Sequence, residues 1–337
     1  MVSGPRAARV TVSRAPQLVG ACWQSRGVRP CCDHKMKAKT DWASIQLLYG
    51  ITPPKVSSPE ERRREIAETQ VQRINQLPVD GLIVYDLQDE STRTKVERPF
   101  PFVACIDPFE YAYNYLAQVA LPKIVYRSVS THSEEALGHW LTQLNERGGA
   151  SVLVGAPADD HPMVMKIGDA YKLRRAVVPS LPLGGVVIAE RHEELGGEDE
   201  RVLRKVSSGC EFFVSQAVYS VTKSKNLLSD LYYNCQRKEV AMPHIYITLS
   251  PCGSAKTLEF VEWLGVHVPS WLKNELLYAG DILEKSIELS VSGFAELHEF
   301  AQSKGFQLGC NVESVSLRKA EIDASVEMVE RIRPLLG

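Results

Sequence analysis

The chain has 337 residues, of which 44% are hydrophobic and 24% are charged, and its formal net charge is -2. A chain of this length and composition can bury a large core, either as one α/β domain or as two smaller ones. The near-neutral charge gives no reason to expect nucleic acid or an anionic membrane as a partner. No run approaches the roughly 18 consecutive apolar residues of a membrane span. We therefore expect a soluble, cytoplasmic protein.

The eight cysteines do not form the pattern of a disulfide scaffold. Most of them are scattered through apolar stretches, which predicts buried, reduced thiols. The segment Cys31–His34 contains two adjacent cysteines, an aspartate and a histidine. Adjacent cysteines lack the spacing of zinc ligands, and no second ligand pair follows, so we predict no metal site.

Residues 1–40 differ from the rest of the chain, and we treat them as an N-terminal extension without a predicted fold. Five arginines precede the first acidic residue, and no helical or strand period is kept. This pattern is typical of an Arg-rich, acid-poor targeting peptide, which would make the protein organellar. It fits equally well an upstream extension that is not natively made, with Met36 as the true start. Residues 41–337 are predicted to form the folded domain.

From residue 41 onwards, short β-rich runs alternate with longer amphipathic segments. Each short run is almost continuously apolar, as in GLIVYD or SVLVG, which is typical of strands buried on both faces in a parallel sheet. In chain order, the predicted strands are Ser44–Gly50, Gly81–Asp86, Lys123–Val129, Ser151–Gly155, Gly185–Glu190, Glu211–Gln216, His244–Leu249 and Gln307–Val312. After the first strand, Pro53 and Pro54 prevent further pairing, so the chain leaves the sheet there.

Amphipathic segments with helix-start signals lie between the strands. In the first, Ser58 is predicted to cap the helix and Pro59 to occupy its first position. Ser133 is predicted to cap another helix, which Gly148 and Gly149 end. The remaining predicted helices are Glu110–Val119, Pro162–Ala176, Glu198–Ser207, Lys223–Cys235, Ala255–Trp263, Ala279–Ser303 and Lys319–Leu336.

Eight strands, each followed by a helix, match a (β/α)8 barrel in number and in length. The alternative is a doubly wound open sheet, which would usually carry a Gly-rich phosphate-binding turn after its first strand. The sequence contains no GxGxxG motif and no P-loop motif. We therefore predict a (β/α)8 TIM barrel, with its chemistry at the carboxyl ends of the strands.

Polar side chains close several predicted strands, where they cost burial energy unless they face a pocket. Asp86 and Glu90 directly follow the second strand, where they would orient a polar ligand; a solvated loop is the alternative. Gln216 ends the sixth strand. Its carboxamide offers one acceptor and two donors, which suits a heterocycle such as a pterin, and a structural hydrogen bond is the alternative.

A basic group follows the fifth predicted strand. His192 comes just after this strand, and the next predicted helix carries Arg201, Arg204 and Lys205. Arg201 and Lys205 share a helical face, with Arg204 alongside. Beside a barrel mouth, these side chains would hold the pyrophosphate of a dinucleotide, and a solvated basic face is the alternative. The sequence has no GxSxG motif, so a Ser/His/Asp hydrolase has little support.

Together these segments resemble the methylenetetrahydrofolate reductase family, flavoproteins built on a (β/α)8 barrel. The likeness runs from about Ser44 to the C-terminus as scattered anchors. The first anchor is the Pro53-Pro54 corner, and the most specific is IAERH…RVLRKVSSGCEFFVSQ, which is similar to the family's Tyr-Pro-Glu-x-His, Leu-Lys-x-Lys, Gly-Ala-x-Phe and Thr-Gln motifs. The other anchors are VHVPSWLKNELL and SVSLRKAEI.

The resemblance implies a cofactor, a substrate and a reaction. It implies that FAD is contacted by Tyr85, His192, Arg201, Arg204 and Lys205, and that Gln216 binds the folate pterin. The implied reaction is the NAD(P)H-dependent, flavin-mediated reduction of 5,10-methylenetetrahydrofolate to 5-methyltetrahydrofolate, in one-carbon and methionine metabolism. The implied partner is the folate substrate, and the sequence leaves open whether the chain forms a homo-oligomer.

The sequence departs from this family at positions that the chemistry uses. The family's proposed proton donor, a glutamate of its first strand, aligns with Gly50, and an aspartate near the flavin aligns with Ala156. A general acid supplies roughly 10²–10⁴-fold in rate, so the usual reaction needs a substitute. The candidates are Glu90, Glu313 and Asp86. Two other hypotheses are a folate-binding barrel without reductase activity that acts with a one-carbon-transfer partner, and a flavin enzyme with another substrate.

Overall fold

The computed structural model describes residues 1, 40, 42, 44–91, 94–156 and 163–337. Nearly all of the predicted extension, residues 1–40, lies outside the described residues, so its nature stays a prediction. Lys39–Gly337 form one compact unit. Among the described helices, none is both long enough and apolar enough to cross a membrane.

Eight parallel strands close into a barrel, in which each strand pairs with the next along the chain and β8 pairs with β1. The strands are β1 Leu47–Ile51, β2 Gly81–Val84, β3 Lys123–Ser128, β4 Ala150–Val154, β5 Leu183–Val187, β6 Phe212–Ala217, β7 His244–Leu249 and β8 Leu308–Glu313. All eight predicted strands are present, with bounds that shift by only a few residues. The predicted (β/α)8 TIM barrel is therefore confirmed.

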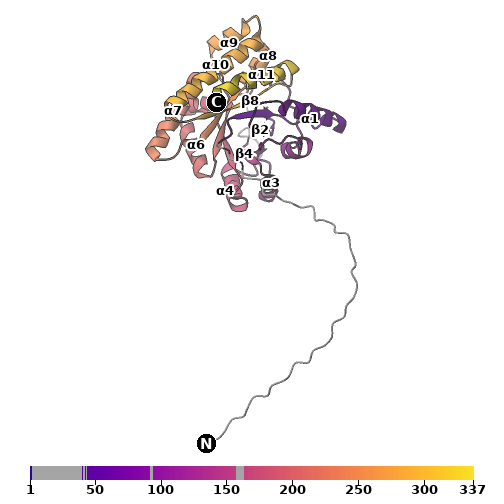
Figure 1. Cartoon of the computed structure of the whole chain (residues 1–337), viewed down its shortest axis with the longest axis vertical. Helices are drawn as coiled ribbons and strands as arrows, with labels where there is room; N and C mark the ends of the chain where they lie inside the picture. The colour runs from indigo at the N-terminus through magenta and orange to yellow at the C-terminus, as the bar shows by residue number, and fades with distance from the viewer. Residues whose placement is uncertain (2–39, 41, 43, 92–93, 157–162) are drawn as a thin grey trace, which may run out of the picture. The chain divides into compact units, whose positions relative to one another are not determined.

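Helices surround the barrel (Figure 1). In chain order they are α1 Glu60–Ile74, α2 Pro108–Glu110, the π-helix η1 Tyr111–Tyr115, α3 Glu134–Glu146, α4 Ile167–Val177, α5 Ala189–Leu195, α6 Glu198–Ser207, α7 Val221–Lys238, α8 Ala255–Trp263, α9 Ser270–Leu277, α10 Ile282–Ser303 and α11 Lys319–Leu336. The predicted helix over residues 110–119 is thus only a short α-turn followed by a π-helical turn.

Local signals explain some of the helix ends. Ser133 Oγ accepts the amide hydrogen of Ala136 at 3.2 Å, which confirms the predicted cap of α3. Gly148, with φ at +69°, ends this helix as predicted, because a residue without Cβ adopts that backbone freely. The predicted cap by Ser58 is wrong. Pro59 has an extended ψ of 154° and itself precedes α1, without a side-chain cap.

Two further bounds differ from the prediction. The long helix predicted from residue 279 begins later, at Ile282 of α10. Asp281 caps it, because its Oδ1 accepts the amide hydrogens of Leu283 and Glu284 at 2.9 and 3.1 Å. The fifth strand does not reach Glu190. Ile188 is the last extended residue, and Glu190 lies in the first turn of α5.

The interior of the barrel is a packed core. Because strand residues alternate between two faces, one set points inward and the other faces the helices. The inward set is Leu48, Ile83, Ile124, Tyr126, Val152, Phe212, Val214 and Tyr246, joined by Trp42, Ile45 and Ala150. The Tyr246 hydroxyl donates to the carbonyls of Trp42 and Ile45 at 3.1 and 3.2 Å, which ties the segment before β1 to β7. Side chains therefore fill the inside of the barrel, and its carboxyl end is where the chemistry of this fold is usually found.

The loop between β2 and α2, residues 85–107, reaches the segment that follows β7. Trp263 Nε1, at the end of α8, donates to the Val96 carbonyl at 2.9 Å. The Arg98 guanidinium lies 5.1 Å from the centre of the Phe260 ring and 5.3 Å from that of Trp263. These contacts, each worth about 0.5–1 kcal/mol or more, hold the loop against α8.

Candidate functional site

Polar side chains from four neighbouring segments of the barrel meet at its carboxyl end. They are Tyr85, Tyr126, Thr248, Asn311 and Glu313, which we call the mouth cluster. Asn311 Nδ2 donates to the Tyr85 hydroxyl at 2.9 Å and to Thr248 Oγ1 at 3.2 Å. The ring centres of Tyr85 and Tyr126 are 4.7 Å apart. The cluster thus combines aromatic faces with donors and acceptors.

A hydrogen-bond relay fixes the orientation of the Asn311 carboxamide. Thr248 Oγ1 donates its hydrogen to the Ser215 carbonyl at 2.7 Å, so it can only accept from Asn311. The amide nitrogen of Asn311 must therefore face Thr248, and Oδ1 must face the other way. Asn311 is fully buried, and its Oδ1 has no hydrogen-bond partner among the described residues. Leaving such an acceptor unmatched costs about 1–3 kcal/mol, a cost that a ligand donor reaching this atom would remove.

Asn311 Oδ1 lies next to Gly50, which has no side chain. A Cβ at position 50 would lie 3.3 Å from Asn311 Oδ1, 3.0 Å from Glu313 Cβ and 2.8 Å from Tyr85 Cε2. The place where the resembled family has a glutamate side chain is therefore taken up by Tyr85 and Glu313. The absence of a side chain at Gly50 is a packing requirement of this site.

Replacing Gly50 with alanine is expected to lower the free energy of unfolding by about 1–3 kcal/mol, because the added methyl group overlaps the Tyr85 ring. The matched control is Gly280→Ala, since a Cβ at Gly280 meets nothing within 4 Å. The control should change stability by less than about 0.5 kcal/mol. Urea denaturation of both variants measures the difference, and equal midpoints would contradict the packing argument.

Glu313 stands directly beside Gly50, because β1 and β8 pair Gly50 with Glu313. Burial raises the pKa of the Glu313 carboxyl group, while its hydrogen bonds with Tyr85 and Asn311 act in the opposite direction. Burial and the neighbouring Glu313 raise the pKa of Tyr85 and of Tyr126 well above the usual value, so both phenols keep their hydrogens. The role of Glu313 as surrogate acid stays a prediction; the structure places it beside Gly50, the position that aligns with the family's proposed proton donor.

The other two candidate acids are differently placed. The Asp86 carboxylate accepts the Ser128 amide hydrogen and the Gln88 side-chain hydrogen, both at 2.8 Å, and ties the end of β2 to β3. Burial raises its pKa. Glu90 lies on the loop of residues 85–107, where its charge acts on Arg98. Neither belongs to the mouth cluster as defined above, and the catalytic role of Glu90 stays a prediction.

Gln216 makes the structural hydrogen bond that was its alternative reading. Its Nε2 donates to the Leu264 carbonyl, just after α8, at 2.7 Å. The strand is irregular here, since the pairing of β6 with β7 shifts between Val214 and Ala217. One donor of the carboxamide is thus used within the protein, and its contact with a pterin stays a prediction.

The basic residues predicted to hold FAD are separated by their own partners. Arg204 is exposed and pairs with Glu200 on α6 at 3.8 Å. Lys205 is largely buried, donates to the Val186 carbonyl at 2.5 Å, and has its pKa lowered by burial. His192 Nε2 lies 3.0 Å from Asp230 Oδ2 on α7. Each of these three side chains has a different partner, so they do not converge on a place where one phosphate could bind.

Arg201 also has a carboxylate partner. The Glu198 carboxylate is fully buried, and Arg201 Nε approaches it at 3.4 Å. Arg191 reaches the same carboxylate at 3.3 Å, and the Ile188 amide donates to it at 3.3 Å. Arg201, which the sequence assigned to a cofactor, thus shares the Glu198 carboxylate with Arg191. The predicted set does not fit FAD as one anion-binding site.

Within the described part of the chain, no group of three or more His, Cys, Asp or Glu residues is arranged to hold a metal ion. The described cysteines all carry free thiols, and Cys105 alone among them is not buried.

No protein-family model and no curated protein matches this sequence. Among solved structures, the chain is similar to an uncharacterized protein from Clostridium thermocellum that binds two copies of 5-methyl-5,6,7,8-tetrahydrofolic acid. The two are 43% identical, with a TM-score of 0.76, over 87% of this chain and 96% of that chain. A GH113 β-1,4-mannanase is similar at 11% identity and a TM-score of 0.50, over 84% of this chain and 98% of that chain, which shows the fold alone. Identity of 43% over almost the whole neighbour shows that this chain belongs to the same protein family as the Clostridium thermocellum protein.

Proposed function

We propose that this protein binds a reduced folate of the 5-methyltetrahydrofolate class at the mouth cluster. The observation that carries the proposal is the buried, unmatched Oδ1 of Asn311, fixed in place beside Tyr85 and Glu313. It occurs in a chain whose Clostridium thermocellum relative binds two copies of 5-methyltetrahydrofolic acid. Folate binding is accordingly the function that we place first.

The chemistry of a tetrahydropterin matches the mouth cluster. One edge of the pterin presents ring and amino N–H donors, which need acceptors such as Asn311 Oδ1 and the Glu313 carboxylate. The flat bicyclic ring needs aromatic or apolar walls, which Tyr85 and Tyr126 offer together with Val154 and Val186. Donors, acceptors and walls therefore come from different strands of one barrel end.

Titration calorimetry of the full-length chain with 5-methyltetrahydrofolate tests this proposal. The control ligand is 4-aminobenzoylglutamate, which has the tail of folate without the pterin. We expect saturable heat from the folate and none from the control, because the pterin carries the donors. A chain that binds neither ligand would contradict the proposal.

A second candidate function is the FAD-mediated, NAD(P)H-dependent reduction of 5,10-methylenetetrahydrofolate. Glu313 favours it, because this side chain stands beside Gly50, where the resembled reductase family has its proton donor. The raised pKa of Glu313 would keep it protonated to a higher pH. The basic residues predicted for FAD do not fit, as described above, so we place reduction second. A barrel that only binds folate and serves a one-carbon-transfer partner needs no FAD site, so the mouth cluster alone would be enough for that function.

Visible absorption spectroscopy separates the two candidates. After incubation with FAD and removal of free cofactor, we expect no flavin band, because the predicted phosphate ligands are engaged with Glu198, Glu200 and the Val186 carbonyl. A retained band that NADH or NADPH bleaches, and that methylenetetrahydrofolate restores, would reverse our order and establish the reductase.

A further inference from the structure

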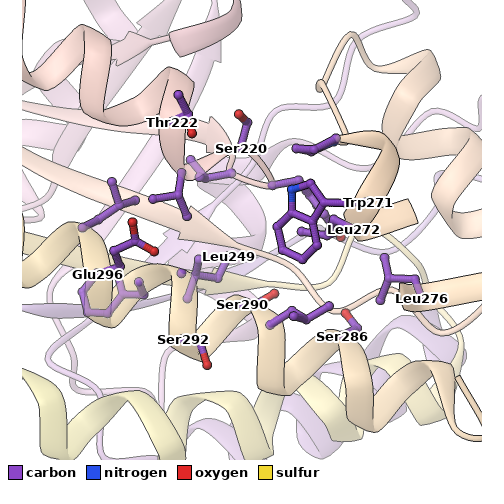
Figure 2. A pocket seen from close by; sticks show the side chains of 18 residues that line it. Ser220, Thr222, Leu249, Trp271, Leu272, Leu276, Ser286, Ser290, Ser292 and Glu296 are labelled. Atoms are coloured by element: carbon purple, nitrogen blue, oxygen red, sulfur yellow. The ribbon is translucent and has the colours of Figure 1, made fainter. Parts of the chain in front are cut away.

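A cavity of about 230 Å³ lies outside the barrel, between α7, α9 and α10 (Figure 2). Its lining comes from the β6–α7 connection, the end of β7, and the facing sides of α9 and α10. Most of the lining is apolar, including Leu249, Leu272, Leu276, Leu289 and Leu297. Hydroxyl groups also line it, among them those of Ser220, Thr222, Ser286, Ser290 and Ser292. An apolar hollow with a few polar groups is typical of sites that bind a flat heterocycle.

Trp271 borders this cavity with an unusually exposed indole ring. It lies in the first turn of α9, and 59% of its surface is accessible. Figure 2 shows the indole on one side of the cavity and the Glu296 carboxylate on the other. Tryptophan is usually well buried, so an exposed indole at the edge of a hollow is a ready stacking surface for a flat ring.

Polar groups are available at the floor and at the far end of the cavity. Ser286 is buried, and its Oγ accepts the Cys252 amide hydrogen at 2.7 Å, which leaves its own hydrogen to donate. Glu296 pairs with Lys225 at 2.7 Å, and both side chains remain partly exposed. The cavity thus offers hydroxyl groups and the Glu296 carboxylate, whose partner Lys225 lies beyond the lining.

We propose that this cavity is a second reduced-folate site, with an aromatic ring of the ligand stacked on Trp271. The inference rests on the proposed function, and it accounts for a stoichiometry of two like that of the Clostridium thermocellum relative. The mouth cluster has one set of pterin acceptors, Asn311 Oδ1 and the Glu313 carboxylate, which is enough for one pterin. The second copy therefore needs another set of donors, acceptors and walls.

The size of the cavity defines how the ligand enters. At about 230 Å³ it is smaller than the roughly 300–1,000 Å³ of sites that enclose a whole drug-sized ligand. It therefore takes one end of the molecule, the pterin, whose N–H edge pairs with the Glu296 carboxylate. The p-aminobenzoyl ring then lies against Trp271, and the glutamate tail stays in solvent.

Calorimetry of the full-length chain with 5-methyltetrahydrofolate tests this site. The wild-type chain is expected to bind two copies. In Trp271→Ala, one site should keep its affinity, and the other should weaken at least tenfold, because an aromatic stacking contact is lost. Ser290→Trp, which fills the cavity, should remove the second site. The matched control is Tyr278→Ala: this side chain follows α9, is 87% accessible and does not line the cavity.

Three results would overturn this assignment. If both cavity variants bind two copies with wild-type affinities, the second site lies elsewhere, while folate binding at the mouth stands. If the wild type binds one copy and Trp271→Ala does not change its affinity, the cavity is not a folate site, while folate binding at the mouth again stands. If Trp271→Ala instead turns a dimer into a monomer in sedimentation, the cavity is a contact between copies of the chain. A wild type that binds no folate contradicts the proposed function itself.

Discussion

Replacing Asn311 with leucine is expected to weaken the binding of 5-methyltetrahydrofolate by about 5–150-fold. Leucine has a shape similar to that of asparagine, so the barrel stays packed. The Asn311 carboxamide presents Oδ1 as an unmatched acceptor, and leaving a ligand N–H without it costs about 1–3 kcal/mol. The substitution also removes the donor to Tyr85 and Thr248, so those side chains lose their fixed positions. Titration calorimetry at constant pH measures the change.

The control for this prediction is Asn234→Leu. Asn234 is another buried asparagine, and its Nδ2 donates to Asp199 at 2.9 Å, but it lies on α7 in the outer helical layer. Both variants should unfold at a lower temperature than the wild type, because each loses buried hydrogen bonds. Only Asn311→Leu should lose folate affinity. Equal affinities of the two folded variants would show that the mouth cluster does not bind the pterin.

The fold was predictable because its signals are local. Each strand is an apolar run with a polar or glycine-rich end, and several helices carry their own start or stop residues, so no distant contact is needed to recognise these elements. The errors occurred where local patterns compete. Glu190 continues an apolar run, yet it lies in the first turn of α5, and Asp281 caps α10 inside a longer helical pattern.

The site was less predictable, because its partners are distant in sequence. Arg201 and His192 looked free for a cofactor, but the fold brings Glu198 and Asp230 against them. Asn311 was overlooked because it lies inside an apolar strand. A polar carboxamide within such a strand is itself a signal, since burying it is costly unless it binds something.

Gly50 shows how one position carries both kinds of information. In the sequence, Gly50 stands where the resembled family has an acidic residue. In the structure, the missing side chain at Gly50 makes room for Glu313 and Asn311 Oδ1 to pack against the backbone. β8 carries the Glu313 carboxyl group directly opposite Gly50 of β1, so a carboxylate stands next to the position that lacks one. A comparison limited to aligned positions cannot detect such a neighbour.

Replacing Glu313 with glutamine is expected to weaken folate binding by about 10–150-fold at a pH above the raised pKa of Glu313, since hydrogen bonds to a charged group are worth about 1.5–3 kcal/mol. The ionised carboxylate is the form that accepts two N–H groups of a pterin. Burial raises the pKa of Glu313 above its ordinary value of 4.5, so wild-type affinity should increase as the pH rises through that raised pKa. In Glu313→Gln, this pH dependence should be absent.

Stability should change with pH in the opposite direction. Because the folded chain holds the Glu313 proton more tightly than the unfolded chain, its contribution to stability is complete below pH 4.5 and is lost as the pH rises through the raised pKa. Glu313→Gln should therefore unfold at a higher temperature than the wild type at a pH above the raised pKa, and this advantage should vanish below pH 4.5. Thermal unfolding and calorimetry across the same pH series measure both effects. A wild-type affinity that falls with rising pH would mean that Glu313 works in its protonated form, as a proton donor, and would favour the reductase over simple folate binding.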